Sequence, residues 1–363
     1  MFLCSKVSRP LFHQTKQQFR TRNMSSIVNA AKATLSENLG GIAQSLAPAG
    51  TEFSLDDVPD QSGKVAVVTG GSAGIGYGAT HTLLTKNISK LFILSGGEEK
   101  ADTAHQAISK ELGEEKASRV VLVHCDLGDW KSISGAAKKI TDGTDRLDIL
   151  IQNAGRGIMT YQLSDLGVDR HMAVNHFGHA LLTSHLLPLL KNTASGQNVV
   201  RVTNQASNLH ESAPKDTKFA SLDELNTDLG PNGQYGRAKL ANILFSRYLA
   251  RHLTKDHPRI LVNATHPGVV FTDMSQKDIH EPYPLLGYGM SVAAAPFKKD
   301  QFDGALSTLY AATVTHKSGE YICPPAAVEP GSELSQDEAL QDQLMKLTRE
   351  IIAEKMNGET LEL

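Results

Sequence analysis

The sequence predicts an α/β fold in which one doubly wound parallel sheet of about seven strands carries helices on both faces. Two observations support this prediction. From residue 64 onward, short apolar segments without polar alternation recur, as expected of parallel strands that are buried on both faces. Longer segments lie between them, and their apolar residues recur at the three- and four-residue spacings typical of helices. With 363 residues, 40% of them hydrophobic, the chain can bury the core of one large domain.

The expected strands are short runs rich in Val, Ile and Leu. In chain order they are Val65–Thr69, Lys90–Leu94, Val120–His124, Leu147–Gln152, Asn198–Thr203, Ile260–Thr265 and Gly319–Cys323. Helical periodicity is clearest in Asp165–Leu190 and Tyr235–Leu253, and Glu338–Met356 predicts an amphipathic helix of mixed charge. Right-handed crossovers between the strands would place a ligand beyond their carboxyl ends.

We expect residues 60–325 to form this domain and to include a substrate loop at 275–300. Residues 1–59 would be an amino-terminal extension, and residues 326–363 a carboxyl-terminal helical extension. Residues 282–297 are uncharged and contain three prolines and two glycines, which favours a loop over a helix. That loop could line a substrate site, cover a cofactor or pack against the second subunit of a homodimer.

Charge and composition argue against several classes of protein. The formal net charge of −3 and the lack of a basic block argue against a nucleic-acid partner. The cysteines Cys4, Cys125 and Cys323 are widely spaced, so neither a disulfide framework nor a metal site is expected. No apolar run reaches the ~18 residues needed for a transmembrane segment. Residues 1–36 lack acidic residues but carry Lys and Arg, as mitochondrial presequences do; alternatively, Met24 starts a cytoplasmic form, and the sequence leaves both locations open.

Tyr235 and Lys239 lie four residues apart, so on a helix they share one face, a turn apart. An unperturbed phenol titrates near pH ~10, and a neighbouring cation favours phenolate, which brings the group toward the range of general acid/base catalysis. This spacing is common by chance, and for the pair alone a surface tyrosine beside a solvated lysine is the simpler interpretation. The rest of the sequence favours the interpretation of Tyr235 and Lys239 as a catalytic pair.

A glycine-rich segment, Thr69–Gly76, follows the first strand and precedes a helix. Its glycines allow a tight turn in which backbone N–H groups at the positive end of the helix can bind a pyrophosphate. A plain strand-to-helix turn would look similar, but the alternation of strands and helices around it favours dinucleotide binding. The candidate binding residues here are Gly70, Ser72, Gly74, Ile75 and Gly76.

Three motifs, in family order, resemble the short-chain dehydrogenase/reductase family and its Rossmann-type fold over roughly residues 60–325. They are the glycine segment with three residues between Gly70 and Gly74, Asn153-Ala154-Gly155 after the fourth strand, and Tyr235-x-x-x-Lys239. Three further segments are similar to the retinol dehydrogenase and WW-domain oxidoreductase branch of that family. They are Asn175-His176-Phe177-Gly178-His179, the run from Tyr235 to Phe245, and His266-Pro267-Gly268-Val269-Val270.

The resemblance implies a catalytic tetrad of Asn175, Ser207, Tyr235 and Lys239. Ser207 is the matching serine, because this branch places its serine a few residues before a His, here His210. In the implied roles, Tyr235 donates the proton and Ser207 also bonds the carbonyl oxygen. Lys239 binds the nicotinamide ribose, and Asn175 holds a water in a proton path. Taken singly, Ser207 could cap a turn and Asn175 could be an ordinary polar helix residue, but their joint occurrence favours the tetrad.

The resemblance also implies dinucleotide contacts outside the glycine segment. They are Asp126 and Leu127 near the adenine, Asn153, Ala154 and Gly155 after the fourth strand, Tyr235 and Lys239, and Pro267, Gly268 and Thr272 near the carboxamide and phosphates. Asp126 could equally be a helix cap, and Asn153 could do no more than stabilise a loop. We interpret His266 as structural, and Cys125 and Trp130 as packing residues.

The tip of the second strand bears on the choice between NADP and NAD. It reads Leu94-Ser95-Gly96-Gly97, and it holds neither the acid that binds the ribose hydroxyls of NAD nor a basic partner for the phosphate of NADP. Without an acid to repel a phosphate, the sequence favours NADP, with NAD as the alternative. Gln152 replaces the usual Asn, and no amino-terminal apolar anchor like that of membrane-bound retinol dehydrogenases is present, which weighs against retinoid activity.

These residues together predict an NAD(P)-dependent oxidoreductase that transfers hydride between nicotinamide and a moderately apolar ketone, aldehyde or alcohol. The alternative is a non-catalytic dinucleotide-binding sensor, which would need the glycine segment but not Ser207, Tyr235 or Lys239. A third interpretation is a scaffold in which Glu338–Met356 binds a protein partner, although its mixed charges more simply indicate a solvated amphipathic helix.

Overall fold

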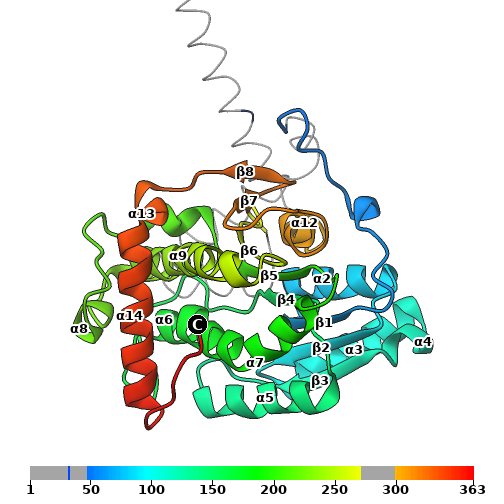
Figure 1. Cartoon of the computed structure of the whole chain (residues 1–363), viewed down its shortest axis with the longest axis horizontal. Helices are drawn as coiled ribbons and strands as arrows, with labels where there is room; N and C mark the ends of the chain where they lie inside the picture. Colours follow the sequence, from blue (N-terminus) through cyan, green and yellow to red (C-terminus); the bar gives the residue numbers. More distant parts are fainter. Residues whose placement is uncertain (1–31, 33–46, 271–298) are drawn as a thin grey trace, which may run out of the picture.

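The computed structural model describes residue 32 and residues 47–270 and 299–363. A sheet of eight strands lies at its centre, in the order β3-β2-β1-β4-β5-β6-β7-β8 (Figure 1). The strands are β1 (Val65–Thr69), β2 (Lys90–Ser95), β3 (Val120–His124), β4 (Ile149–Gln152), β5 (Val200–Gln205), β6 (Ile260–Thr265), β7 (Tyr321–Cys323) and β8 (Ala327–Glu329). Strands β1 to β7 are parallel, and β8 is antiparallel to β7. The predicted doubly wound parallel sheet is confirmed, with one more edge strand.

Helices connect the parallel strands and cover the sheet. They are α2 (Gly74–Thr85), α3 (Glu98–Leu112), α4 (Glu114–Ala117), α5 (Trp130–Gly143), α6 (Arg170–Met172), α7 (Gly178–Ala194), α8 (Leu222–Leu225), α9 (Gly230–Asp256), α12 (Leu306–Thr313), α13 (Glu333–Gln336) and α14 (Glu338–Lys355). Short 3-10 turns are η2 (Leu55–Asp57), η4 (Asn208–Ser212) and η6 (Asp303–Ala305), and η3 (Ala173–Phe177) is a π-helical turn.

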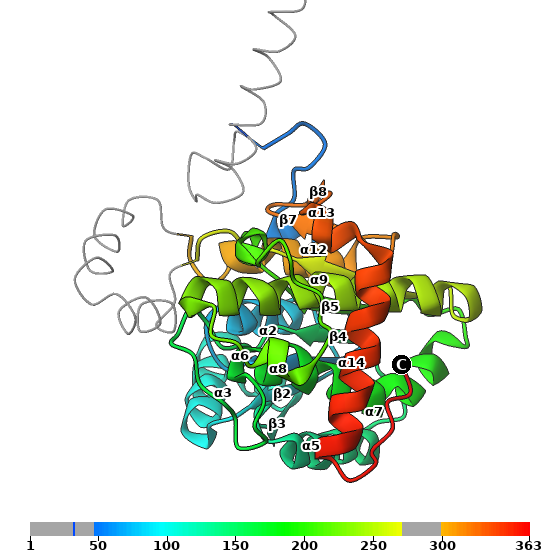
Figure 2. The same ribbon diagram turned by 90° about the vertical axis from the view of Figure 1, so that its left-hand side faces the viewer.

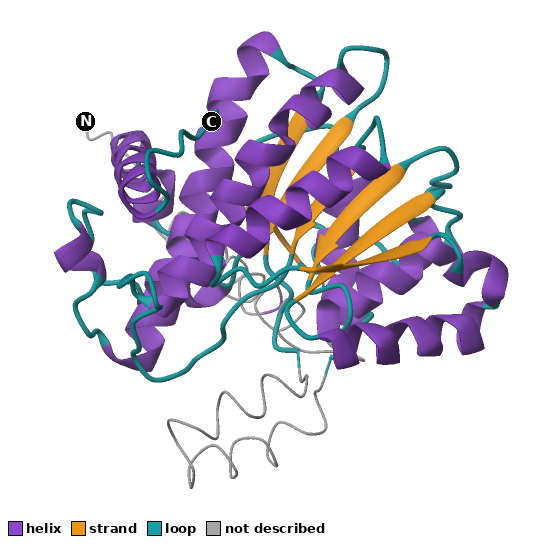
Figure 3. Cartoon of the chain, turned by 90° about the horizontal axis from the view of Figure 1, so that it is seen from below, coloured by secondary structure: helices purple, strands orange, loops and turns teal. Residues whose placement is uncertain are grey.

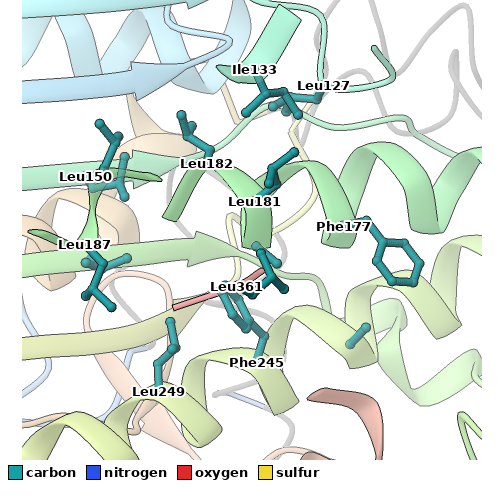
Figure 4. Close-up of a cluster of buried hydrophobic side chains, with 14 of the residues drawn as sticks. Leu127, Ile133, Leu150, Phe177, Leu181, Leu182, Leu187, Phe245, Leu249 and Leu361 are labelled. Atoms are coloured by element: carbon teal, nitrogen blue, oxygen red, sulfur yellow. The ribbon is translucent and has the colours of Figure 1, made fainter. Parts of the chain in front are cut away.

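Both faces of the sheet are buried beneath helices (Figure 3). Val65 and Val67 of β1 pack in one core with α5, α7 and α9, whereas Ala66 and Val68 pack in a second core with α2, α3 and α12. Figure 4 shows part of the first core, with side chains of α5, α7 and α9 and with Leu361 between those of α7 and α9. Because successive strand residues face opposite sides, this double burial explains why β1 is apolar at nearly every position.

Strands β1, β3 and β6 have the bounds that the sequence predicts, whereas β5 begins and ends two residues later. The side chain of Asn198 donates to the carbonyl oxygen of Thr193 and so belongs to the preceding turn. The buried polar residues Asn204 and Gln205 complete the strand instead. The short strand β8 was not predicted, because three residues at a sheet edge give no periodic signal.

The helix predicted at Asp165–Leu190 is wrong at its start. Gly167 lies in a turn with φ of +71°, and the carboxylate of Asp169 caps α6 by accepting from the N–H of Met172 at 2.9 Å. The chain then forms the π-helical turn η3 before α7 continues to Ala194. The other two predicted helices correspond to α9 and α14.

The carboxyl-terminal residues pack on the same body as the sheet. Helix α14 crosses α9 (Figure 2) and buries Leu344, Met345 and Ile352 on its inner side, as its amphipathic pattern requires. The predictions for the amino-terminal extension up to residue 46, apart from Lys32, fall outside the described residues, as do those for residues 271–298, which include Thr272. Within the described ranges, no helix combines the length and the apolar character needed to cross a bilayer.

Candidate active site

The glycine segment forms a tight turn between β1 and α2. Gly70 and Gly74 have φ of +64° and +52°, and the N–H of Gly70 donates to the carbonyl oxygen of Leu94 at 2.7 Å. A Cβ on Gly76 would lie 2.2 Å from the carbonyl oxygen of Gly70, so only glycine fits there. Ala73 is the N-cap of α2 and provides no side-chain hydrogen bond, which leaves the first N–H groups of the helix available to an anion. This arrangement fits the pyrophosphate of a dinucleotide.

The loop after β4 is attached to the glycine turn. The amide of Asn153 donates to the carbonyl oxygen of Thr69 at 3.2 Å, and the N–H of Ala154 donates to Thr69 Oγ1 at 3.0 Å. The Asn153 amide also lies close to Gly76, where an added Cβ would approach its Nδ2 to 2.6 Å. Asn153 therefore stabilises the loop, as one interpretation of the sequence held, and it does so at the edge of the glycine turn.

The tip of β2 lies beside the same turn. Ser72 Oγ donates to Ser95 Oγ at 3.2 Å, and Ser95 Oγ in turn donates to the carbonyl oxygen of Gly97 at 3.0 Å. Neither an acid nor a base occupies the last strand position or the two glycines that follow it. The side chain of Gln152, at the end of β4, points elsewhere and donates to the carbonyl oxygen of His179 at 2.9 Å.

The two residues predicted near the adenine differ in exposure. Asp126 is exposed after β3, and its Oδ1 accepts from the N–H of Gly128 at 2.8 Å. The cap of α5 is Asp129, which accepts from the N–H of Lys131, so Asp126 is not the helix cap. The side chain of Leu127 lies in the core rather than at the surface. Cys125 and Trp130 are buried, which agrees with their interpretation as packing residues.

Asn175 lies in the π-helical turn η3 and is completely buried. Its Oδ1 accepts from the N–H of Arg156 at 2.6 Å, and its Nδ2 donates to the carbonyl oxygen of Arg156 at 3.0 Å. The side chain thus closes the loop after β4 with two hydrogen bonds. Its own carbonyl oxygen faces Nδ1 of His179 at 3.0 Å. Asn175 is therefore more than an ordinary polar helix residue, because it ties the loop to the turn.

Ser207 follows β5 and begins η4. Its Oγ accepts from the N–H of Leu209 at 3.2 Å, so the serine caps a turn, as its simplest interpretation predicts. A hydroxyl can accept and donate at once. Its hydrogen is directed at Asn208 Oδ1, 3.4 Å away, and this long bond is easily exchanged for a bond to a ligand. Capping and substrate binding are therefore compatible.

Tyr235 and Lys239 lie one turn apart on α9, as predicted. The ammonium of Lys239 lies 5.5 Å from the centroid of the Tyr235 ring and donates to the carbonyl oxygen of Gln205 at 2.7 Å. Burial lowers the pKa of Lys239 to about 8. Tyr235 itself is partly exposed, so its ring borders the surface while the lysine beneath it is enclosed.

The four predicted tetrad residues come from three neighbouring elements, η3, η4 and α9. A Cβ on Gly236 would lie 2.6 Å from the carbonyl oxygen of Leu209, which shows that α9 touches the turn capped by Ser207 right beside Tyr235. A Cβ on Gly155 would lie 3.0 Å from Asn175 Oδ1 and 3.6 Å from Lys239 Nζ. The loop after β4 therefore fits between the asparagine and the lysine.

The segment after β6 completes the carboxyl edge of the sheet. Pro267 and Gly268 are partly exposed, and Gly268 has φ of +78°. His266 is buried, and its Nδ1 accepts from the N–H of Asn208 at 3.2 Å, which agrees with a structural role. No group of three or more His, Cys, Asp or Glu side chains with metal-binding geometry occurs among the described residues.

The sequence assigns no role in catalysis or cofactor binding to three residues that lie in this site. Gln205 presents its carbonyl oxygen to Lys239 and its Oε1 to Thr308 at 2.7 Å. The ring of His179 joins the carbonyl oxygen of Asn175 to Thr69 Oγ1, 3.0 Å from Nε2. His210 bonds the carbonyl oxygen of Ser207 at 2.7 Å. His179 lies four residues after Asn175, and His210 lies three residues after Ser207. This closeness in sequence to two tetrad residues is the only signal that could have indicated their position in the site.

Comparisons with known proteins identify the family of this chain. A family profile described as short chain dehydrogenase matches residues 64–214. A Neurospora crassa protein named as an oxidoreductase, bli-4, mitochondrial, is 52% identical over 354 residues, covering 96% of this chain and 85% of that protein. The short chain dehydrogenase/reductase dpchH of Colletotrichum higginsianum is 32% identical over 317 residues, covering 82% and 77%. Human retinol dehydrogenase 14 is 31% identical over 274 residues, covering 71% and 77%.

Solved structures share the fold. An uncharacterised protein from Mycobacterium paratuberculosis superposes with a TM-score of 0.62 at 24% identity, covering 83% of this chain and 97% of that one. A Pseudomonas aeruginosa RhlG/NADP active-site complex gives a TM-score of 0.55 at 26% identity, covering 72% and 95%. The chain therefore belongs to the short-chain dehydrogenase/reductase family of nicotinamide dinucleotide-dependent oxidoreductases, in its retinol dehydrogenase-like branch.

Proposed function

We propose that this protein interconverts a moderately apolar ketone or aldehyde and its alcohol, with Tyr235 as the acid/base and Asn175, Ser207 and Lys239 as its catalytic partners. One observation carries the proposal: α9 contacts the turn capped by Ser207 at Gly236, directly beside Tyr235, while Lys239 bonds Gln205 two residues before the serine. A sensor that only bound dinucleotide would have no need of this convergence.

The residues of this chain would handle the proton and the developing charge. A nicotinamide dinucleotide, when bound, supplies or accepts the hydride. In reduction, Ser207 and Tyr235 donate hydrogen bonds to the substrate oxygen, and Tyr235 gives up its proton as that oxygen becomes an alkoxide. The ammonium of Lys239, 5.5 Å from the phenol ring, stabilises the phenolate that remains. In oxidation of an alcohol, the same proton moves in the opposite direction.

The glycine turn and the loops after β3, β4 and β6 would bind the dinucleotide. The first N–H groups of α2 would bind the pyrophosphate, and Lys239 would bind the nicotinamide ribose. Asn153, Ala154 and Gly155 would border the ribose and adenine, with Asp126 and Leu127 beyond them. Asn175 would hold a water in a path that returns a proton to Tyr235.

We further propose that the coenzyme is NADP rather than NAD. The tip of β2 carries Ser95, Gly96 and Gly97, which offer no carboxylate to repel a phosphate on the adenosine ribose. The NADP complex of RhlG, at 26% identity, supports the same choice. Titration of both reduced coenzymes against the protein tests it, and tighter binding of NADH than of NADPH would overturn it.

The experiment that tests the proposed activity is a screen of ketones, aldehydes and alcohols with both coenzymes. The absorbance of the reduced nicotinamide measures turnover in each assay. Tyr235→Phe should abolish turnover while dinucleotide affinity stays within about twofold, because the phenolic proton serves chemistry rather than binding. Tyr310→Phe is the matched control, because Tyr310 of α12 packs against Phe53. This variant should keep full activity. Dinucleotide binding without turnover of any compound would instead support the sensor.

We propose a mitochondrial rather than a cytoplasmic location. Residues 1–36 contain Lys and Arg but no acid, and the Neurospora relative is named as mitochondrial. Fluorescent fusions of the full chain and of a form that starts at Met24 would test this location. A diffuse cytoplasmic signal from the full chain would contradict it.

A further inference from the structure

Two buried histidines adjoin the proposed catalytic residues, and both are bonded to the carboxyl-terminal part of the chain. His210 lies three residues after Ser207, and His176 directly follows Asn175. Their exposed fractions are 2% and 0%. Neither ring faces solvent, so each has to find its hydrogen-bond partners inside the protein.

His210 connects Ser207 to residue 332. Its Nε2 accepts from the backbone N–H of Ser332 at 3.0 Å, so its Nδ1 carries the hydrogen and donates to the carbonyl oxygen of Ser207 at 2.7 Å. The imidazole is thus a rigid link between the active-site serine and a segment more than one hundred residues away in the chain. The adjacent N–H of Asn208 is fixed separately, by Nδ1 of His266.

His176 makes the corresponding link on the other side of the site. Thr348 Oγ1 donates to the carbonyl oxygen of Leu344 at 2.7 Å, so it accepts from Nε2 of His176 at 2.8 Å. The ring is packed edge-on against Phe177 and Phe245. Because His176 lies in the same π-helical turn as Asn175, its position bears directly on that turn.

The carboxyl-terminal segment is itself anchored on the helix that carries Tyr235 and Lys239. Arg247 of α9 donates to the carbonyl oxygen of Ser335 at 2.8 Å and to that of Pro330 at 2.9 Å. The segment 330–348, named here the carboxyl-terminal brace, therefore contacts α9, the Ser207 turn and the Asn175 turn together.

We infer that His210 and His176 are positioning residues through which the carboxyl-terminal brace holds Ser207 and Asn175 in place for the reaction. The inference rests on the proposed function of these two residues. It assigns to residues 330–348 a part in the active site rather than a role in binding a separate partner. Displacements well below the length of a hydrogen bond are enough to slow a reaction that depends on aligned groups.

The sharpest test removes one N–H group. Ser332→Pro deletes the donor to His210, and the native φ of −69° at this residue suits proline. Ser332→Ala is the matched control, because it removes the same side-chain cap of α13 but keeps the N–H. We expect Ser332→Pro to lower kcat about tenfold with KM within about twofold, and Ser332→Ala to resemble the wild type. Equal kcat in the proline variant, the alanine variant and the wild type would overturn the inference.

A second test acts on the ring. In His210→Asn the amide can still donate to Ser207 but cannot reach Ser332, so it should lower kcat as Ser332→Pro does. Combining the two substitutions should cost no more than either alone, because both remove one link. Fully additive losses would show that His210 and Ser332 act independently and would overturn the link between them.

The third test addresses the other side of the site. Thr348→Val removes the acceptor for His176 with little change of shape, whereas Thr348→Ser keeps it. We expect Thr348→Val to lower kcat several-fold and Thr348→Ser to retain the wild-type value. If the two variants had the same kcat, the part of the inference that concerns His176 would be wrong.

A measurement without substrate separates this inference from the proposed function. The N–H of Leu209 donates to Ser207 Oγ, so its hydrogen exchange reports whether the serine turn is intact. Exchange should be faster in Ser332→Pro than in Ser332→Ala, whether or not any carbonyl compound is turned over. Equal exchange in the two variants would overturn the inference. If exchange is faster in Ser332→Pro than in Ser332→Ala but the protein turns over no compound, the carboxyl-terminal brace is supported and the proposed activity is rejected.

Discussion

Lys239 and Gln205 are joined by a hydrogen bond of 2.7 Å between the ammonium Nζ and the backbone carbonyl oxygen. This bond fixes α9 against the end of β5, two residues before Ser207. It partly compensates the loss of water around the ammonium, but the acceptor is neutral, and burial still lowers the pKa of Lys239 to about 8 from its ordinary value of 10.5. The charge of Lys239 therefore changes within the pH range of ordinary assays.

The rate of carbonyl reduction should fall as the pH rises through about 8, because Lys239 then loses the charge that stabilises the phenolate of Tyr235. In Lys239→Arg the fall should move to higher pH, since a guanidinium stays protonated throughout this range. The measurement is kcat/KM against pH for both proteins. Identical alkaline limbs in the two profiles would contradict the assignment to Lys239.

The fall in rate at alkaline pH cannot arise from unfolding that is caused by the titration of Lys239. The pKa of Lys239 in the folded protein lies below its ordinary value, so between about pH 8 and 10.5 the unfolded chain binds more protons than the folded one. Titration of Lys239 therefore raises the free energy of unfolding across that window. Urea unfolding at pH 7.5 and pH 9 would verify that the protein remains folded where its rate declines.

Gly236→Ala should destabilise the protein even though alanine favours helices. The new Cβ would lie 2.6 Å from the carbonyl oxygen of Leu209 and 2.9 Å from the N–H nitrogen of Ala213, and this overlap should cost about 1–3 kcal/mol. Gly135→Ala in α5 is the control, because nothing lies within 4 Å of its added Cβ. That variant should gain about 0.5–1 kcal/mol. Urea unfolding measures both, and equal signs for the two variants would contradict the close contact at Gly236.

Much of the fold follows from local sequence. β1, β3 and β6 are mostly apolar, although β6 contains the buried Asn263, and their bounds agree with the sequence to the residue. The predicted bounds of β5 are wrong because its last residues, Asn204 and Gln205, are polar yet buried. Their partners, Ser246 and Thr308, come from α9 and α12. A polar residue that is satisfied by a distant element cannot be distinguished, in the sequence alone, from one that faces solvent.

The same limit applies to the site. Tyr235 and Lys239 were found because one helix turn separates them, and the glycine turn because it is continuous in sequence. The bond between His210 and Ser332 joins segments that share no local pattern. The interruption of the predicted helix by a π-helical turn at Asn175 also leaves the apolar spacing nearly unchanged. These features depend on packing between elements, which periodicity does not record.

Gly96→Asp should shift coenzyme preference from NADP toward NAD. Gly96 is exposed at the tip of β2, and its added Cβ would make only ordinary contacts, the nearest being the carbonyl oxygen of Cys125 at 3.7 Å. The new carboxylate would repel a phosphate on the adenosine ribose and accept bonds from its hydroxyls instead. We expect NADPH affinity to fall at least about tenfold relative to NADH. Gly96→Asn, which has the same shape without the charge, should change the ratio little; an equal shift in both variants would contradict an electrostatic cause.

The protein should lose stability steeply below pH 6.5. Burial lowers the pKa of His176 and His266 to about 3 and that of His179 to about 4, against an ordinary value of 6.5. Between pH 6.5 and 4 the unfolded chain therefore binds more protons than the folded protein, and the free energy of unfolding falls as the pH is lowered. Each imidazole contributes about 1.4 kcal/mol per pH unit, so the three together approach about 4 kcal/mol per unit.

Urea unfolding between pH 7 and pH 5 measures this slope, which is large against the total stability of about 5–15 kcal/mol typical of a domain. His179→Gln should remove about one third of the part of the slope that these three rings contribute, whatever its effect on stability at pH 7, because it removes one of the three protons that they take up on unfolding. His124→Gln is the control, since His124 is exposed and its ring already meets solvent in the folded state. A wild-type slope near zero in this range would mean that the buried rings of His176, His179 and His266 already bind protons in the folded protein.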